Sequence, residues 1–511
     1  MKNGKAVYVA GKMDKKGATA YGRYNNTLMS TGWGILEIRA GYGALKKNHD
    51  LMYAAGFLEG VFTARQIYQN YMNLKPVAVP QSRPKLEEKL RRYFQKNDEW
   101  VRGMISKHSS GDPYWRHVAY IMAQFDGLYD GYKSVADMNK SWPNDVFVVQ
   151  MLNGIGDVID LAKALEPESW PDYAHMSHSE LLKYVNARGH CSALIKVTGA
   201  YEDMFMSHSS WFMYAATMRI FKHYHFNVLD PQTSIKEMSF SSYPGFLESL
   251  DDFYLMDNSL VLLQTTNSVY NQSLYKLVQP ASVLAWQRVR VANMMASTGK
   301  EWTQVFAKFN SGTYNNQYMV IDLKKIHLGQ SIDDNALWVV EQIPGLVVGE
   351  DQTPTLRTGY WPSYNVPFYE SVYNQSGYPD FVKKHGTDFS YQLAPRAKIF
   401  RRDQGKVVDM TTMKAIMRYN DYKTDPYSEG QPCNAICCRG DLGEDPAPFG
   451  CFDTKVSDYK MALLRQAFVM NGPTLGTGLK PFSWTGPFKN TSHVGLPTTY
   501  DFDWVPTRPL L

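Results

Sequence analysis

The segment NARGHCSALIK, residues 186–196, places a cysteine directly between a Gly-His pair and a short apolar run. An isolated cysteine most often packs in a protein core as a small apolar residue. Gly189 permits a sharp turn, however, and the residues after Cys191 are typical of the start of a strand. A cysteine at the first position of a strand, behind a flexible turn, is what an autocleaving N-terminal nucleophile requires.

The chemistry of such a nucleophile is self-contained. A thiol held against the carbonyl group that precedes it attacks that carbonyl, moves the acyl group from nitrogen to sulfur, and loses it to water. Cleavage of the His190–Cys191 bond would leave Cys191 with a free α-amine. An α-amine has an ordinary pKa of about 7.7–8.0, so it can accept the thiol proton, and one residue then supplies both nucleophile and base.

The pattern of the chain changes at this cysteine. Before it, two short β-type runs (5–12 and 32–41) precede four segments with apolar residues at helical spacing: 48–74, 84–108, 114–132 and 145–165. After it, β-branched and aromatic runs alternate with turn residues, and helix returns near 414–422 and 456–468. This order predicts an α+β fold with αββα layering. We expect one intertwined domain, with a helix-rich portion (1–190) and a strand-rich portion (191–511).

Composition narrows the class of protein. The net charge of +5 comes from 54 basic and 49 acidic residues, and the basic clusters at 89–96 and before Arg402 are short, which argues against nucleic acid as a partner. No run approaches the roughly 18 apolar residues of a membrane helix, so we expect a soluble or peripheral protein. The apolar stretch near the N-terminus is too short for a secretory signal, so the chain either enters no secretory route or follows a signal already removed.

Glycosylation and cysteine patterns bear on the compartment. Five N-x-[ST] sequons would accept glycans in a secreted chain, at Asn25, Asn139, Asn271, Asn374 and Asn490. The other four cysteines crowd into residues 433–451. In an oxidising compartment a disulfide could involve Cys433 or Cys451, whereas the adjacent Cys437 and Cys438 are poorly placed to bridge each other. Their spacing and the lack of nearby histidines predict no zinc site, and no motif indicates a cofactor.

Seven motifs, in chain order, resemble the phospholipase B-like family, relatives of the insect lamina ancestor protein. They are GHCSALIK (189–196), SHSSW (207–211), DDFYLMDNSLVLLQTTN (251–267), SYNVPFYESVYNQSG (363–377), APRAKIFRRDQ (394–404), MRYNDY (417–422) and DTKVSDYKMA (453–462). The similarity runs from about Thr31 to Asn490. It implies the αββα fold of N-terminal nucleophile hydrolases with helical insertions, and maturation by cleavage before Cys191.

The resemblance also implies roles for individual residues. His208 and Trp211 match the family His-x-x-Trp pattern, whose positions line the pocket beside the nucleophile. Asn365 matches an asparagine expected to donate its side-chain amide to the oxyanion. Arg396 matches a pocket arginine that holds a carboxylate or orients the nucleophile. Ser209 departs from the asparagine that the family often has after the histidine.

These expectations combine into a hypothesis about function. The resemblance implies a secreted or lysosomal glycoprotein that hydrolyses acyl esters of phospholipids through Cys191, with peripheral membrane contact and without a metal. One alternative is an amidase that acts on N-acyl amides or peptides with the same machinery. The other is a lipid-binding glycoprotein that keeps the scaffold without useful turnover. The sequence does not indicate the oligomeric state, the preferred substrate or the pH of activation.

Overall fold

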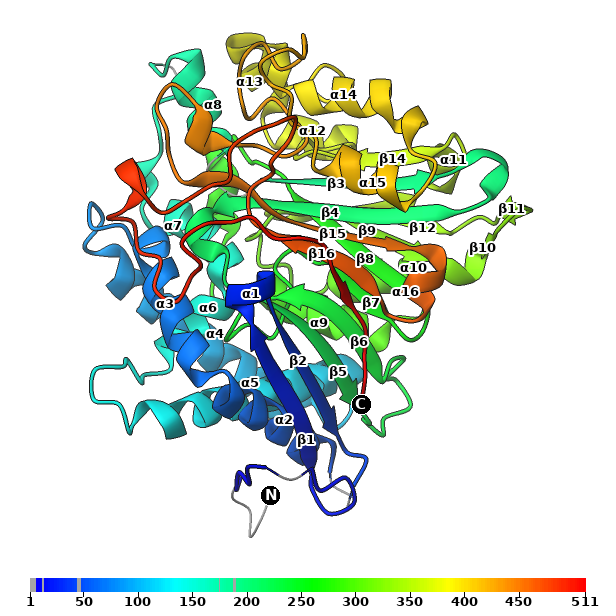
Figure 1. Ribbon diagram of the computed structural model, residues 1–511. Coiled ribbons are helices and arrows are strands. Elements are labelled where there is room, and N and C mark those ends of the chain that lie inside the picture. The colour runs from blue at the N-terminus through cyan, green and yellow to red at the C-terminus, as the bar shows by residue number, and fades with distance from the viewer. Residues whose placement is uncertain (1–5, 12, 44–46, 174, 187–189) are drawn as a thin grey trace.

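The computed structural model describes residues 6–11, 13–43, 47–173, 175–186 and 190–511. Within this part of the chain, two large sheets enclose a shared apolar cluster, and helices lie on the sides of the sheets that face away from it (Figure 1). The α+β class predicted from the sequence is confirmed. The turn predicted at Gly189 lies outside the described residues.

The larger sheet takes strands from both sides of Cys191. Its first two strands precede the cysteine, and the second pairs in parallel with the next strand, which follows the cysteine by more than two dozen residues. All other pairs in this sheet are antiparallel. In spatial order the strands are β1 (Ala20–Thr27), β2 (Trp33–Ala40), β5 (Arg219–Phe226), β6 (Glu237–Ser242), β7 (Tyr254–Met256), β8 (Leu260–Thr266), β9 (Asn316–Asp322), β12 (Leu337–Ile343) and β13 (Leu346–Asp351).

The smaller sheet contains the predicted nucleophile. It is antiparallel throughout, and its spatial order is β14 (Tyr360–Ser363), β3 (His190–Val197), β4 (Met204–Met213), β15 (Phe449–Asp458), β16 (Ala467–Asn471) and β17 (Val505–Thr507). A separate short hairpin pairs β10 (Ile326–His327) with β11 (Ser331–Ile332). Residues 193–196 of β3 pair with both β14 and β4, whereas His190, Cys191 and Ser192 pair with β4 alone.

Side-chain alternation along the strands separates the apolar clusters. Val261 and Leu263 of β8 belong to the same cluster as Ala193 and Ile195 of β3, so these faces of the two sheets pack together. The intervening residue of β8, Leu262, packs instead with the helices on the other side of its sheet. A strand presents successive side chains to opposite faces, which is why one strand serves both clusters.

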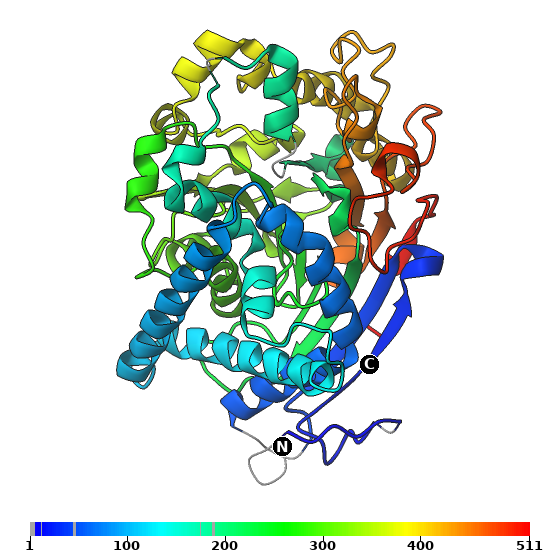
Figure 2. The same ribbon diagram turned by 90° about the vertical axis from the view of Figure 1, so that its left-hand side faces the viewer.

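Two long helices approach each other closely against the larger sheet, α2 (Asn48–Phe62) and α5 (Pro113–Ala136). Gly56 and Gly60 of α2 face Gly127 and Gly131 of α5, and a Cβ atom on any of the four would collide with backbone of the opposite helix. Glycine at these positions therefore permits a backbone contact that any larger side chain would prevent. Figure 2 shows these helices, in blue and cyan, in front of the strands.

The remaining helices fall into two groups, before and after Cys191 in the chain. Those before Cys191 are α1 (Leu28–Thr31), α3 (Ala64–Ala78), α4 (Leu86–His108), α6 (Phe147–Asn153), α7 (Ile155–Leu165) and α8 (His178–Asn186). Those after it are α9 (Ala285–Met295), α10 (Gly299–Phe306), α11 (Thr353–Leu356), α12 (Glu370–Gln375), α13 (Tyr378–His385), α14 (Pro395–Asp403), α15 (Met410–Met417) and α16 (Tyr459–Leu463). Side chains of α14 and α15 pack with Leu194 and Phe205 on the smaller sheet. None of the helices in the described part of the chain combines the length and apolar character of a membrane span.

One predicted strand was wrong, and two predicted helices are present with different bounds. Residues 6–10 form no strand, and the edge of β2 is instead paired by β1, whose largely polar sequence hides its role. Helix α15 ends at Met417, so most of 414–422 is not helical. Residues 456–468 contain the end of β15, the five-residue α16 and the start of β16, because pairing with neighbouring strands overrides the helical pattern.

Candidate active site

Cys191 lies at the start of β3 with its backbone held on both sides. Its N–H donates to Asn365 Oδ1 at 3.1 Å, and its carbonyl oxygen accepts from an Arg396 Nη atom at 2.6 Å. The side chain is only 6% exposed. Burial raises the pKa of its thiol to about 12, although the backbone N–H of Trp211 acts in the opposite direction. In this environment the thiol is protonated at neutral pH.

Asn365 follows β14 and adopts a left-handed backbone conformation, with φ of 71°. Its Nδ2 donates to the carbonyl oxygen of Thr266 at 2.6 Å. A backbone N–H can only donate and a carbonyl oxygen can only accept, so Cys191 and Thr266 together fix the orientation of the amide. The predicted oxyanion donor is therefore engaged with Thr266 here, and it is the acceptor side of Asn365 that faces Cys191.

Arg396 lies in the first turn of α14, and its guanidinium group is buried against the start of β3 and the Trp211 ring of β4. Besides the carbonyl of Cys191, an Nη atom contacts Ser192 Oγ at 3.2 Å. The guanidinium carbon is 4.3 Å from the centre of the Trp211 ring, in the range of a cation–π contact. Burial lowers the pKa of Arg396 to about 9. The group thus anchors the backbone of Cys191 through charge-assisted hydrogen bonding.

His208 and Trp211 lie on β4, which pairs with β3 in a register that sets Ser210 opposite Cys191. Because side chains alternate, His208 and Ser210 share the face of Cys191, whereas the Trp211 ring packs on the other face with the disulfide-bonded cysteines. His208 Nδ1 is 3.5 Å from Ser210 Oγ. Burial, reinforced by the charge of Lys455, holds the pKa of His208 well below its usual range, so this imidazole is neutral.

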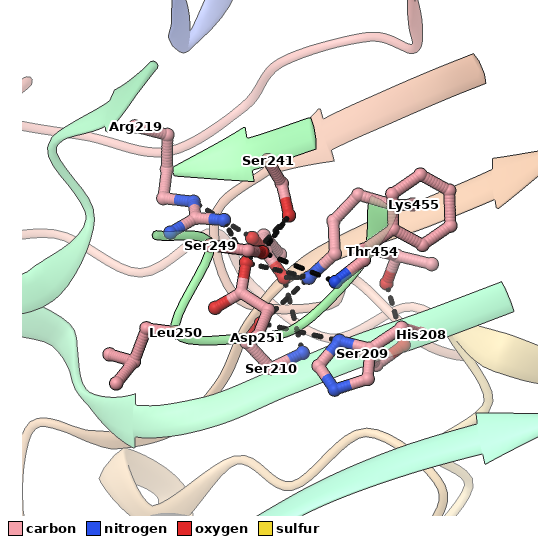
Figure 3. A network of polar contacts seen from close by, with 12 residues as sticks. His208, Ser209, Ser210, Arg219, Ser241, Ser249, Leu250, Asp251, Thr454 and Lys455 are labelled. Atoms are coloured by element: carbon pink, nitrogen blue, oxygen red, sulfur yellow. Dashed lines mark hydrogen bonds and ion pairs between the residues drawn. The ribbon is translucent and has the colours of Figure 1, made fainter. Parts of the chain in front are cut away.

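A buried charged network, which the sequence analysis did not single out, lies beside these residues (Figure 3). Lys455 Nζ is 2.7 Å from Ser210 Oγ, 2.7 Å from Asp453 Oδ1 and 3.3 Å from Asp251 Oδ2. Arg219 pairs with both carboxylates, with Asp453 at 2.9 Å. All four charged side chains are 0–2% exposed. Two buried cations therefore balance two buried carboxylates and fix the serine opposite Cys191.

The network does have a signal in the sequence. Asp251 opens the DDFYLMDN motif, and Asp453 and Lys455 open DTKVSDYKMA, which are two of the motifs that carry the family resemblance. Taken by itself, the first motif indicates a turn beside a strand, and the second indicates a strand followed by a helix. Their charged residues converge only through the pairing of β4 with β15 and the packing of the loop that contains Asp251.

That loop is strained where it lines the same cavity as Cys191. Leu250 and Asp252 have φ values of 65° and 52°, a region that residues other than glycine rarely occupy. Burial and the neighbouring Asp251 charge raise the pKa of Asp252 well above its usual range, and burial with Asp252 does the same for Glu248. Strain of this kind persists only where the surrounding structure imposes it, and it clusters at functional sites.

A small cavity of about 40 Å³ opens at Cys191. Its lining includes Ser210 and Asp251 from the polar side, and Ile155, Ile159 and Phe212 from the apolar side, among other residues. The site therefore places a thiol at the boundary between a charged, hydrogen-bonded wall and an apolar wall. No group of three or more His, Cys, Asp or Glu side chains among the described residues could hold a metal ion.

The C-terminal cysteines and the sequon asparagines do not line this cavity. The C-terminal cysteines form the disulfides Cys433–Cys438 and Cys437–Cys451, so Cys433 and Cys451 are both bridged and the adjacent pair is not joined to each other. Of the sequon asparagines, Asn25, Asn374 and Asn490 are exposed and Asn139 and Asn271 are half-buried. The backbone of His190 lies in β3, so the predicted cleavage bond is at the start of that strand.

Comparison with known proteins agrees with the resemblance seen in the motifs. The family model described as Phospholipase B matches residues 20–507. Phospholipase B-like 1 of Rattus norvegicus is 53% identical over 510 residues, which cover 99% of this chain and 90% of the rat protein. Phospholipase-B 81 of Drysdalia coronoides is 54% identical over 510 residues, with 99% and 91% covered. Phospholipase B-like protein A of Dictyostelium discoideum is 36% identical over 503 residues, with 94% and 87% covered. The chain belongs to the phospholipase B family.

Proposed function

We propose that the chain is an acyl hydrolase that cuts its own His190–Cys191 bond and then uses Cys191 to hydrolyse acyl esters of phospholipids. The observation that carries the proposal is the double anchoring of Cys191, since two residues distant in sequence hold its backbone nitrogen and carbonyl oxygen. Strand β14 pairs with β3 only from Ala193 onward, so at Cys191 side chains take the place of a strand partner and hold the backbone in position. The family relatives named phospholipase B support the acyl-ester class of substrate.

The first step is self-cleavage. The Sγ atom of Cys191 attacks the carbonyl carbon of His190, the C–N bond breaks, and the nitrogen leaves as the α-amine of Cys191. Water then hydrolyses the resulting thioester and returns the thiol. Asn365 Oδ1 already accepts a hydrogen bond from the nitrogen that becomes this amine, so it is placed to hold the amine after cleavage.

The second step repeats the chemistry on a lipid. The high pKa of the buried thiol means that a nearby base must take its proton, and the new α-amine is the closest candidate. The thiolate attacks the ester carbonyl, the protonated amine gives its proton to the departing alcohol, and water releases the fatty acid from the acyl-enzyme. We assign oxyanion stabilisation to backbone N–H groups and to Asn365 Nδ2 once it exchanges its bond to Thr266.

We assign the remaining predicted residues to supporting roles. Arg396 positions the backbone of Cys191, and Trp211 holds the guanidinium of Arg396. His208, held neutral, supports Ser210 opposite the nucleophile. The arrangement of helices outside two facing sheets is in keeping with the αββα fold of N-terminal nucleophile hydrolases. The two disulfides favour an oxidising compartment such as the secretory or lysosomal lumen, where the sequons would carry glycans.

The proposal is tested by purifying the chain, incubating it across acidic and neutral pH, and following it on a denaturing gel. Scaling 58.3 kDa by 190/511 and 321/511 gives fragments of about 22 and 37 kDa, the larger one beginning with Cys191. Cys191→Ala should remain intact, with an unchanged melting temperature showing that it folds. The same fragments from this variant would refute self-cleavage.

Substrate class is decided with the cleaved protein. Release of fatty acid from phosphatidylcholine vesicles by the wild type, and none by Cys191→Ala, supports the phospholipase proposal. Hydrolysis of N-acyl amides without fatty acid release from phospholipid would replace it with an amidase. Lipid binding by a folded protein that turns over neither substrate would identify a binding protein.

A further inference from the structure

A second and larger cavity lies beside the small one at Cys191. Its volume is about 510 Å³, which is in the range of sites for small organic ligands. Ile155 and Ile159 of α7 and Phe212 at the end of β4 line both cavities, so only these three side chains need to shift for a ligand to reach from one space into the other. The cavity is lined by residues from the end of α3, from α7 and from α8, and in Figure 1 α7 lies between α3 and α8.

The wall of this cavity is mostly hydrocarbon. Val77 and Ala78 at the end of α3 face it opposite Val158 and Ala162 of α7. The one basic side chain in the lining, Arg83, is already committed, because its Nε donates to a carboxylate oxygen of Glu166 at 2.7 Å. A ligand that fills this space therefore gains mainly from apolar contact, and a charged head group finds no free basic partner in the lining.

We propose that this cavity binds the acyl chain of the substrate, with the ester carbonyl at Cys191 and the chain passing between Ile155, Ile159 and Phe212. The inference rests on the proposed hydrolase function and names a subsite for it. In this arrangement, successive positions along α7 contact the acyl chain at increasing distances from Cys191. Ile155 and Ile159 stand at the junction with the nucleophile, and Ala162, almost one turn beyond Ile159, lines only the larger cavity.

The assignment to one acyl chain follows from the position and the lining of the two cavities. The Cys191 thiol lines the small cavity, and the larger apolar cavity lies next to it behind three shared side chains, so an elongated apolar group attached to an electrophilic carbon fits the pair. Part of the wall, including Met176 and Tyr184, belongs to the segment that precedes Cys191. That segment therefore remains part of the proposed acyl site even if the His190–Cys191 bond is cut.

The test is a large side chain placed in the far part of the cavity. Ala162→Phe should lower kcat/KM for hexadecanoyl esters relative to butanoyl esters by at least about tenfold, because each buried methylene group contributes about fourfold to binding. Ala162→Leu is a milder version that should shift the same ratio less. The matched control is Ala119→Phe, since Ala119 lines a separate hollow on α5. Direct binding of the fluorescent fatty acid cis-parinaric acid gives a readout that needs no turnover.

The outcomes separate this proposal from the hydrolase proposal. A changed chain-length ratio and weaker parinaric acid binding in the Ala162 variants, with the control unaffected, support the acyl site. Normal turnover with an unchanged ratio and unchanged probe binding overturns the acyl site and leaves the hydrolase intact. Absence of ester turnover, with probe binding that Ala162→Phe weakens, upholds the acyl site and refutes the hydrolase.

Discussion

Replacing Lys455 with methionine tests the charged network beside the nucleophile. The ammonium group lies within 3.3 Å of Asp453, Asp251 and Ser210 oxygens, and the two carboxylates are 0–2% exposed. Methionine fills a similar volume but leaves Arg219 alone to balance both carboxylates. Removing one partner of a buried ion pair typically costs about 3–5 kcal/mol, since it leaves an uncompensated buried charge. We expect the free energy of unfolding, measured by urea titration near pH 7, to fall by about this amount.

The pH dependence gives a second readout. Burial alone would raise the pKa of Asp251, but Arg219 and then Lys455 outweigh it and hold the pKa below its usual range. In the wild type, the stability from Asp251 is therefore present above its unfolded pKa and is lost as pH falls through its folded pKa. Loss of Lys455 raises the folded pKa, so the folded variant takes up a proton at a higher pH. The stability difference between wild type and variant should therefore shrink as pH falls from 7 towards 4.

Lys222→Met is the matched control. Lys222 is also fully buried, and its Nζ is 2.6 Å from Glu59 Oε1, but it lies outside the cavity at Cys191. Both variants should lose stability, whereas only Lys455→Met should slow self-cleavage under conditions where both remain folded. A stability loss below about 1 kcal/mol, or equal cleavage rates in the two variants, would refute the assigned role of the network.

Four further changes test the site and the fold. Asn365→Asp keeps an acceptor for the Cys191 nitrogen and should slow self-cleavage, followed by gel densitometry, less than Asn365→Ala; the reverse order would point to Nδ2 as the essential group. In uncleaved protein, the pKa of about 12 predicts that iodoacetamide labels Cys191 about tenfold faster per unit of pH above 8, measured by mass spectrometry; a plateau near pH 8 would contradict it. Gly127→Ala places a Cβ against the Tyr53 carbonyl and should cost about 1–3 kcal/mol in urea unfolding, while Gly103→Ala, in open space, should not destabilise. Cys451→Ser removes one disulfide and should cost about 2–5 kcal/mol; a melting temperature equal to that of the wild type would show that the bridge adds nothing.

The sequence predicted helices and strands well in segments where apolar residues recur with one clear helical or strand period. The helical segments before residue 165 and the strand that starts at Cys191 lie where the sequence placed them, because each carries its own apolar periodicity. The pattern failed at β1 and around α16. The largely polar β1 pairs with β2, and the helical spacing of 456–468 yields to strand pairing with β4 and β16. Strand pairing of this kind depends on residues distant in the chain, so a short stretch of sequence does not predict it.

The sequence by itself determined the family, the position of the unusual cysteine and the predicted site residues. Seven motifs in the order typical of the family were enough to identify it and to match its site positions. Only the tertiary structure decided how they meet. It turned the acceptor side of Asn365 towards Cys191, directed the Trp211 ring to the opposite face, and brought Asp251 and Lys455, 204 residues apart, into one buried network. These contacts arise from strand register and sheet packing, which fix the face of every side chain at once. The same packing created the apolar cavity next to the site of Cys191, whose lining no single motif encodes.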